Sequence, residues 1–326
     1  MSEANVDQNV NAPRLKPEGP WKIAWNRFKK NKIALVGGIS FVAIVIAVII
    51  IPMIYSFNLW RDVEGVTTGQ LVRETLNVDL RAHGFELENS EQPPSRENLL
   101  GTDRQGRDVM FRLFYGGRIS MLVGVLSAFL TVTLGTLVGG VAGYYGGKTD
   151  GFLMRFAEIV QSIPFLPMMM VISAAMRWVP SEQTMLVVVF VVGILSWPGL
   201  ARVVRGQILS LREQEFMQAT EILGISDTSR IGRHLLPNVL AYIIVSATLG
   251  MGSAILMEAG LSFLGLGVTP PMPSWGNMIQ TARNSTVFLN YPWIWIPPGL
   301  MIMLTVVSVN LLGEGLRDAF DPKEIR

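Results

Sequence analysis

The run Gly147-Lys148-Thr149 has the ending of a phosphate-binding loop, in which backbone N–H groups, a lysine and a hydroxyl hold the phosphates of a nucleotide. That pattern requires another glycine five places before Gly147, but the position is Ala142, and an apolar helix rather than a strand comes before it. We therefore interpret the run as a tight turn and expect no nucleotide to bind there.

Side chains that commonly carry catalysis or bind metals are scarce elsewhere. The chain has no cysteine, so thiolate chemistry, disulfides and cysteine-bound metals are excluded, and its two histidines, His83 and His234, predict no metal cluster. Its apolar segments hold neither paired carboxylates nor a serine beside a base. We therefore predict that the chain is not an enzyme and binds no cofactor or metal. The net charge of +2 predicts no nucleic-acid partner.

Glu258 has the most unusual setting among the acidic residues, because it ends a long apolar run and stands shortly before Ser262 and Phe263. An ionisable group close to a membrane interior is often functional. Two interpretations stay open at this point. Glu258 is a structural carboxylate near the membrane surface, or it lines a pathway or gate together with Ser262 and Phe263.

Composition and hydropathy place these residues in a membrane. Half of the 326 residues are hydrophobic, 16% are charged, and the mean hydropathy is +0.39. Crossing a hydrocarbon core about 30 Å thick takes about 20 apolar residues in a helix. Such segments are predicted at 33–55, 119–144, 156–176, 185–204, 239–257 and 293–312. The expected fold class is an all-α integral membrane protein with six transmembrane helices.

Some spans contain features that should bend them or bring them together. The third is the weakest because Pro164 and Pro167 interrupt it, and Pro198 predicts a kink in the fourth. Small residues at four-residue spacing in the second span predict close contact with a neighbouring helix, of this chain or of a partner. They are Gly135, Gly139 and Gly143.

Lysine and arginine set the expected orientation. They are concentrated in the segments that would lie inside, whereas the two short outer loops carry one each, so both termini are predicted to be cytoplasmic. Residues 1–17 should be a disordered cytoplasmic tail. Residues 18–55 should form an amphipathic helix, carrying Trp21, Trp25 and Phe28, and the first span. Residues 56–118 are predicted to be extracytoplasmic, and residues 119–326 to form the membrane core.

A polar segment, residues 202–238, interrupts the apolar pattern between the fourth and fifth spans. Phe216, Thr220 and Leu223 share one face of a predicted helix, with Ala219 beside them. An apolar face directed at the cytosol needs a protein groove to cover it. The alternative is an ordinary surface loop whose apolar face dips into lipid.

The end of this helix is also predicted from sequence. Gly224 can adopt the left-handed conformation that stops a helix, and Ser226 or Asp227 can begin a second short one.

The same segment resembles the EAA loop of ABC-importer permeases, whose pattern is Glu-Ala-Ala, three residues, Gly, nine residues, then Ile-x-Leu-Pro. The spacing is kept although several residue types differ. The matching positions are Gln218, Ala219, Thr220, Gly224, His234, Leu236 and Pro237. Because Gln218 replaces the glutamate, it can form a hydrogen bond but no salt bridge.

Further motifs along nearly the whole chain are similar to those of the dipeptide, oligopeptide and nickel importer permeases. They are Trp21 to Gly37, Leu100 to Asp103 with Gly106-Arg107-Asp108, Leu261 to Gly267 with Pro273-Ser274-Trp275-Gly276, and Asn310 to Gly313 with Gly315-Leu316-Arg317-Asp318. This resemblance implies the type I importer permease fold, with residues 119–326 as the permease core and an extracytoplasmic insertion between the first two transmembrane helices.

The resemblance also implies partners and a location. The chain would sit in the plasma (inner) membrane of a prokaryote, surrounded by lipid, and form half of a pathway for di- or oligopeptides. A homologous second permease subunit, two cytoplasmic ATPase subunits and an external or periplasmic solute-binding protein would complete the importer. ATP and Mg would be held by the ATPases, which the loop 216–237 would contact. No residue separates peptides from nickel chelates or oligosaccharides as cargo.

Two other classes of protein predict different patterns. An ion-coupled secondary transporter predicts ionisable residues near mid-membrane and an inverted repeat, and neither is clear in this sequence. An intramembrane enzyme predicts a catalytic group of residues within the spans, which is absent.

Overall fold

The computed structural model describes residues 20–61 and 89–320. These residues form helices, connecting loops and one isolated antiparallel bridge between Thr102 and Asp108. Within them, five helices are long and apolar enough to cross a membrane, and a bent pair of helices makes a sixth crossing when it is counted as one span. The predicted all-α membrane fold is thereby confirmed. The tail 1–17 and the centre of the insertion lie outside the described residues.

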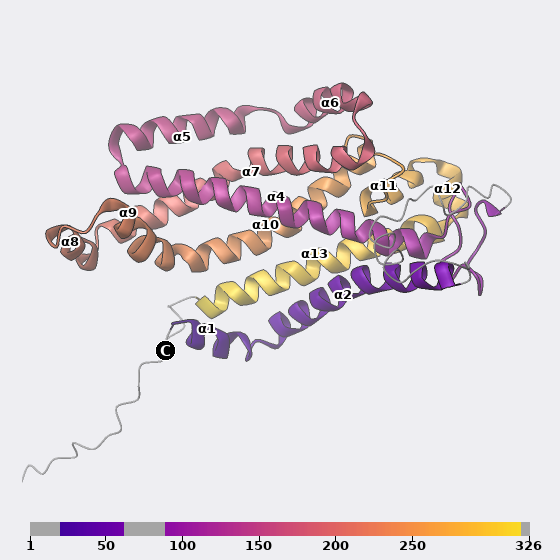
Figure 1. The fold of residues 1–326 in the computed structure, drawn as a ribbon, viewed down its shortest axis with the longest axis horizontal. Coiled ribbons are helices and arrows are strands. Elements are labelled where there is room, and N and C mark those ends of the chain that lie inside the picture. Colours follow the sequence, from indigo (N-terminus) through magenta and orange to yellow (C-terminus); the bar gives the residue numbers. More distant parts are fainter. Residues whose placement is uncertain (1–19, 62–88, 321–326) are drawn as a thin grey trace, which may run out of the picture.

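Long helices run side by side through the bundle, and short ones lie at its two ends (Figure 1). The long helices are α2 (Lys32–Arg61), α4 (Val109–Tyr145), α7 (Ser181–Arg212), α10 (Leu236–Leu264) and α13 (Pro292–Phe320). One end carries α1 (Pro20–Phe28), α8 (Glu215–Ile222) and α9 (Asp227–Ser229), and the other carries α11 (Trp275–Gln280) and α12 (Ser285–Asn290). The C-terminal end of α13 lies beside α1, so both ends of the described chain are at the α8 end.

The third crossing is broken, which corrects the single span predicted at 156–176. It consists of α5 (Gly147–Ser162) and α6 (Phe165–Ala175), which meet at an angle of 71°. Pro164 explains the break, because the residue before a proline is driven out of the helical region, and Ile163 is extended with ψ of 118°. In contrast, α7 continues as one helix through Pro198.

The turn between α4 and α5 lies at the glycines that begin the Gly-Lys-Thr run. Gly146 and Gly147 both have positive φ, at 64° and 54°, a conformation that residues with a side chain rarely adopt. The chain therefore reverses within two residues, as predicted for a tight turn.

The second crossing begins at Val109 rather than at residue 119. The carboxylate of Asp108 caps this helix by accepting the N–H of Phe111 at 2.8 Å. Burial raises the pKa of this carboxyl, while the hydrogen bond from Phe111 acts in the opposite direction. Residues 109–118 thus belong to α4, although they were assigned to the extracytoplasmic segment.

Helices α4 and α7 cross at the predicted glycines, so their neighbour is another span of this chain. A Cβ atom at Gly135 would lie 2.9 Å from Leu200 Cβ, and one at Gly143 would lie 2.9 Å from the carbonyl oxygen of Arg205. At Gly139, between them, a Cβ would collide with the backbone of Ala201. The two helix backbones are therefore in direct contact.

Only part of α1 follows the predicted membrane-surface pattern. Ala24 and Phe28 are buried against α13, whereas Trp25 is exposed beside Lys29, whose ammonium lies 5.0 Å from the ring centre. The helix is therefore docked on the bundle by one face, and it presents a tryptophan and cations on another.

Arg118 on α4 compensates for a proline in α2. Pro52 has no N–H to donate to the carbonyl of Val48, four residues earlier. The Arg118 guanidinium donates to that carbonyl at 3.0 Å and to the carbonyl of Ile49 at 2.6 Å. This contact joins the first two crossings at a point where the helix lacks its own hydrogen bond.

We expect Arg118→Ala to lower the free energy of unfolding by about 1 to 3 kcal/mol, because the Val48 carbonyl loses its donor. In a Pro52→Ala background the cost should be smaller by about 1 kcal/mol, since residue 52 then supplies an N–H. Unfolding of the four proteins in detergent by titration with SDS measures this coupling. An equal cost of Arg118→Ala in both backgrounds would contradict the compensation.

Candidate coupling site and pathway

Helix α8 turns one face into the bundle and the other outward, but the division differs from the predicted one. Met217 is 0% exposed and Thr220 is also buried, whereas Leu223 is 75% exposed and Phe216 is partly so. The expected common face of Phe216, Thr220 and Leu223 is therefore wrong. Met217 instead joins a core cluster formed by α4, α7 and α10, because the short helix lies back against their ends.

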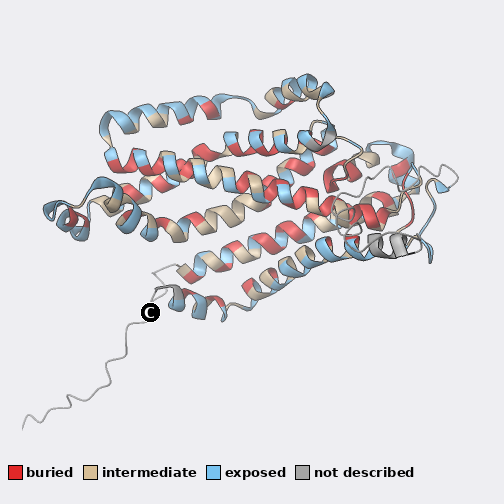
Figure 2. Ribbon diagram, in the orientation of Figure 1, coloured by how far each residue is buried: buried red, intermediate tan, exposed pale blue. Residues whose placement is uncertain are grey.

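Most of α8 is exposed (Figure 2). Besides Glu215 and Glu221, the exposed residues are Phe216, Gln218, Ala219, Ile222 and Leu223, which we call the α8 patch. Ile222, at 87% exposure, was not singled out from the sequence. Gln218 makes only a long hydrogen bond, 3.4 Å to the carbonyl of Glu213, so its amide stays available to a partner. The α8 patch is therefore a candidate docking surface.

Gly224 ends α8 as predicted. It has a φ of 68°, its N–H donates to Glu221 O at 2.9 Å, and the N–H of Ile225 donates to Thr220 O at 3.1 Å. These two bonds form the Schellman arrangement, which satisfies carbonyls that the helix leaves open. The glycine therefore fixes the direction in which the chain leaves the α8 patch.

The second helix of the loop is not a separate short one. Helix α9, the π-helical turn η3 (Arg230–Leu235) and α10 form one continuous helical segment of 38 residues, from Asp227 to Leu264. Pro237 lies in the first turn of α10, and the Asn238 amide donates to the carbonyl of His234 at 2.6 Å. Ser226 is at the N-cap position, although its side chain makes no capping hydrogen bond. The loop thus leads directly into the fifth crossing.

Polar contacts tie this loop to the ends of two other crossings. The hydroxyl of Tyr144, at the end of α4, donates to Asp227 Oδ1 at 2.6 Å. Arg212, at the end of α7, donates to the carbonyl of Tyr144 at 2.7 Å. Arg230 forms an ion pair with Glu221 at 3.0 Å, which joins α8 to the start of the fifth crossing. A displacement of α8 would therefore be transmitted to α4, α7 and α10.

Glu258 is 0% exposed and is held by hydroxyl groups. The hydroxyl of Ser120 donates to it at 2.9 Å and that of Ser262 at 2.7 Å. These serines in turn accept the N–H groups of Trp275 at 3.1 Å and Val268 at 3.0 Å. Such contacts are typical of a structural carboxylate. Sequence reasoning missed Ser120, which lies 138 residues away along the chain.

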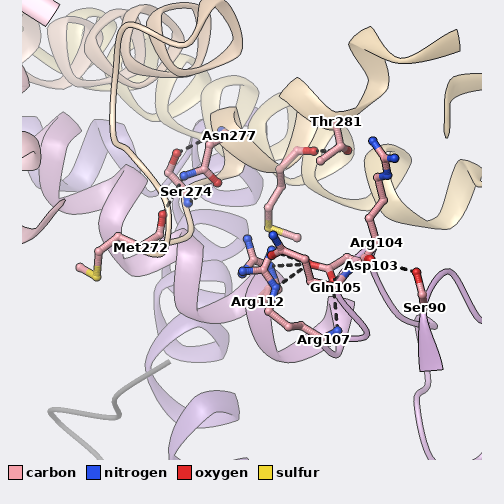
Figure 3. Close-up of polar contacts among 11 residues, drawn as sticks. Ser90, Asp103, Arg104, Gln105, Arg107, Arg112, Met272, Ser274, Asn277 and Thr281 are labelled. Carbon is pink, nitrogen blue, oxygen red and sulfur yellow. Dashed lines mark hydrogen bonds and ion pairs between the residues drawn. The ribbon is translucent and has the colours of Figure 1, made fainter. Parts of the chain in front are cut away.

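Helix α11 packs against α4, α10 and α13 at the end of the bundle opposite α8. The indole of Trp275 is fully buried and donates to the carbonyl of Leu113 on α4 at 2.8 Å. Ser274 and Asn277 form a capping box, and the Asn277 amide also donates to the carbonyl of Met272 at 2.7 Å (Figure 3). The Pro-Ser-Trp-Gly motif thus closes one end of the bundle.

A second motif of the same end is organised by a carboxylate. Asp103 is surrounded by two arginines, with Arg107 at 2.7 Å and Arg112 at 3.3 Å (Figure 3). It also accepts the N–H of Gln105 at 2.8 Å. These contacts give the segment a structural role, since Asp103 folds the turn that leads into the cap of α4.

Two of the cavities adjoin α10 or the loop that follows it. The larger, of about 950 Å³, lies between α6, η2 (Met176–Trp178) and the loop that follows α10. Its lining residues are Met170, Ser173, Ala174, Met176, Val179, Thr184, Gly265, Leu266, Gly267, Thr269, Pro270 and Pro271. The smaller, of about 240 Å³, lies between α4, α7 and α10 and includes Ser196, Ser246 and Ser253. Among the residues whose side chains are described, neither lining contains a charged one, and neither includes Glu258, Ser262 or Phe263.

The helical bundle, the uncharged cavities and the exposed apolar helix at one end define a multi-pass membrane transport component. Comparison with known proteins specifies the class further. Residues 135–326 match the family of binding-protein-dependent transport system inner membrane components, and residues 19–64 match the N-terminal TM domain of oligopeptide transport permease C. The chain belongs to this family and is the permease subunit of an ABC importer rather than an enzyme.

Similar proteins align with nearly the whole chain. The oligopeptide transport system permease protein OppC of Haemophilus influenzae is 35% identical over 319 residues, 98% of this chain and 94% of the relative. The dipeptide transport system permease protein DppC of Alkalihalophilus pseudofirmus is 38% identical over 304 residues, 93% of this chain and 90% of the relative. A putative peptide permease protein of Brucella suis is 37% identical over 305 residues, 94% of this chain and 92% of the relative.

Proposed function

We propose that this subunit forms half of a pathway for di- or oligopeptides and that the loop 216–237 couples it to ATP hydrolysis. The observation that carries the coupling role is the exposed α8 patch, whose helix packs through Met217 on residues of α4, α7 and α10 and pairs through Glu221 with Arg230. Such a patch needs a protein surface to cover it. Two cytoplasmic ATPase subunits, which hold ATP and Mg, fit this need, one docking on each permease.

The remaining partners follow from the same proposal. A homologous second permease completes the pathway, and a solute-binding protein outside the cell delivers the cargo. The α8 end, with both ends of the described chain, faces the cytoplasm of a prokaryote, because the Lys and Arg residues of the inner segments gather there. Lipid covers the exposed apolar faces of α2, α5 and α6.

Peptide cargo is supported by the relatives, which are named as oligopeptide, dipeptide and peptide permeases. The larger cavity supports this cargo, because the described part of its lining has no charged side chain that would select particular peptide side chains. Residues of the loop Gly265–Pro271 are therefore proposed to face the pathway, in place of Glu258, Ser262 and Phe263.

Uptake by the reconstituted complex tests this function. Proteoliposomes that contain this chain with its co-purified permease and ATPase partners should accumulate a labelled tripeptide only when ATP and the solute-binding protein are both present. Omission of ATP is the matched control. Uptake driven by an ion gradient without the ATPases would contradict the proposal, and so would uptake of a nickel chelate with none of the peptide.

A further inference from the structure

Glu258 is a buried carboxylate that the coupling role does not use. None of its described hydrogen bonds comes from a lysine or arginine, so an ion pair does not hold it in place. Its partners are serine hydroxyls on α4 and α10. They are Ser120 and Ser262.

Each of these hydroxyls also accepts a backbone N–H group from the segment that follows α10. Val268, in the loop, donates to Ser262, and Trp275, the first residue of α11, donates to Ser120. A serine hydroxyl has a single proton, so an oxygen that accepts an N–H is left free to direct that proton at the carboxylate. Glu258 thus orients two serines, which together hold residues 268 and 275.

The loop held in this way forms one wall of the larger cavity, because Gly265, Gly267 and Thr269 are among its lining residues. Contact between the loop and the serines is close. A Cβ atom at Gly267 would lie 2.7 Å from the backbone nitrogen of Ser262. Across the cavity, α6 and η2 make no described hydrogen bond to Glu258.

We propose, on the basis of the proposed function, that Glu258 is a positioning residue for transport. Through its two serines it holds the loop 265–274 and the start of α11 against α4 and α10, and so keeps this wall of the cavity in place at rest. Release of the loop requires the serine contacts to break together, because all of them converge on one carboxylate. The cavity then widens without movement of the bundle as a whole.

The absence of cysteine from the chain makes a direct test available. Val268→Cys places a single thiol in the loop at a residue that is 3% exposed, and it keeps the backbone N–H that Ser262 accepts. Ser127→Cys is the matched control, because Ser127 is equally buried but lies where α4 meets α7. Labelling by a maleimide is followed in the purified complex with and without Glu258→Gln.

Glu258→Gln should speed labelling at position 268 by about tenfold, since a glutamine has one acceptor oxygen and presents an NH₂ group to hydroxyl donors. Position 127 should be unaffected. Ser120→Ala, which removes one contact and keeps the carboxylate, should speed labelling by a smaller factor. It serves as the second variant if Glu258→Gln does not fold. Tripeptide uptake should fall in Glu258→Gln while ATP hydrolysis continues.

Unchanged labelling at position 268 in both variants would overturn the proposal, even if the wild-type complex imports peptide normally. Faster labelling at positions 127 and 268 together would also overturn it, because the bundle as a whole would then have loosened. Failure of the wild-type complex to take up peptide refutes the proposed cargo instead, and the labelling comparison still decides whether Glu258 holds the loop.

Discussion

Gly139→Leu should prevent the folded bundle from forming. A Cβ at this position already collides with the carbonyl of Ala201, and this atom belongs to a helix backbone that cannot rotate away. Overpacking costs about 1 to 3 kcal/mol where side chains can adjust, so we expect about 3 kcal/mol or more here. SDS titration of the purified chain and co-purification of its partner subunits both measure the loss.

Gly206→Ala on α7 is the matched control for a change at a helical glycine. No heavy atom lies within 4 Å of a Cβ built at Gly206. Because alanine favours a helix by roughly 0.5 to 1 kcal/mol over glycine, this variant should be as stable as the wild type or more so. Equal stability of Gly139→Leu and wild type would show that α4 and α7 do not meet at Gly139.

Charge placed on the α8 patch should stop transport while the subunit stays folded. Leu223→Asp and Ala219→Asp each put a carboxylate on a face that an apolar partner surface would cover, where an unpaired charge is strongly unfavourable. We expect ATP-driven uptake to fall by at least about tenfold, which corresponds to about 1.4 kcal/mol of lost coupling. Neither residue is buried, so the Tm of the isolated subunit should not change.

Two further substitutions serve as controls for this prediction. Ser210→Asp adds the same charge at an exposed position near the end of α7, outside the α8 patch, and should leave uptake close to wild type. Met217→Asp, on the buried face of α8, should instead lower the Tm, since the carboxylate would enter the core cluster. Normal uptake by Leu223→Asp would refute the docking role of the α8 patch.

Features that depend on neighbouring residues were predictable from the sequence. The long apolar runs fixed five of the crossings, and the four-residue spacing of Gly135, Gly139 and Gly143 predicted a close helix contact. Gly224 was predicted as a helix end because few other residues adopt a positive φ. In each case a local rule of backbone geometry or burial was sufficient.

Features set by tertiary packing were not predictable in the same way. Helix α8 has apolar residues on more than one face, so the sequence did not show that Met217 would turn inward and Leu223 outward. Glu258 is held by Ser120 on α4 and Ser262 on α10, and these serines in turn bind the start of α11 and the loop before it. Only the fold brings those segments together. The sequence therefore suggested a carboxylate near the membrane surface and did not reveal how deeply Glu258 is buried.

The central claim, that the α8 patch docks on an ATPase subunit, is tested most directly by cross-linking. Leu223→Cys supplies the only thiol of this chain, and a maleimide reagent with a photoreactive arm then captures whatever lies against it. We predict an adduct with the ATPase subunit in the assembled complex, and none from Ser210→Cys. An active complex in which position 223 yields no adduct with the ATPase would contradict the claim.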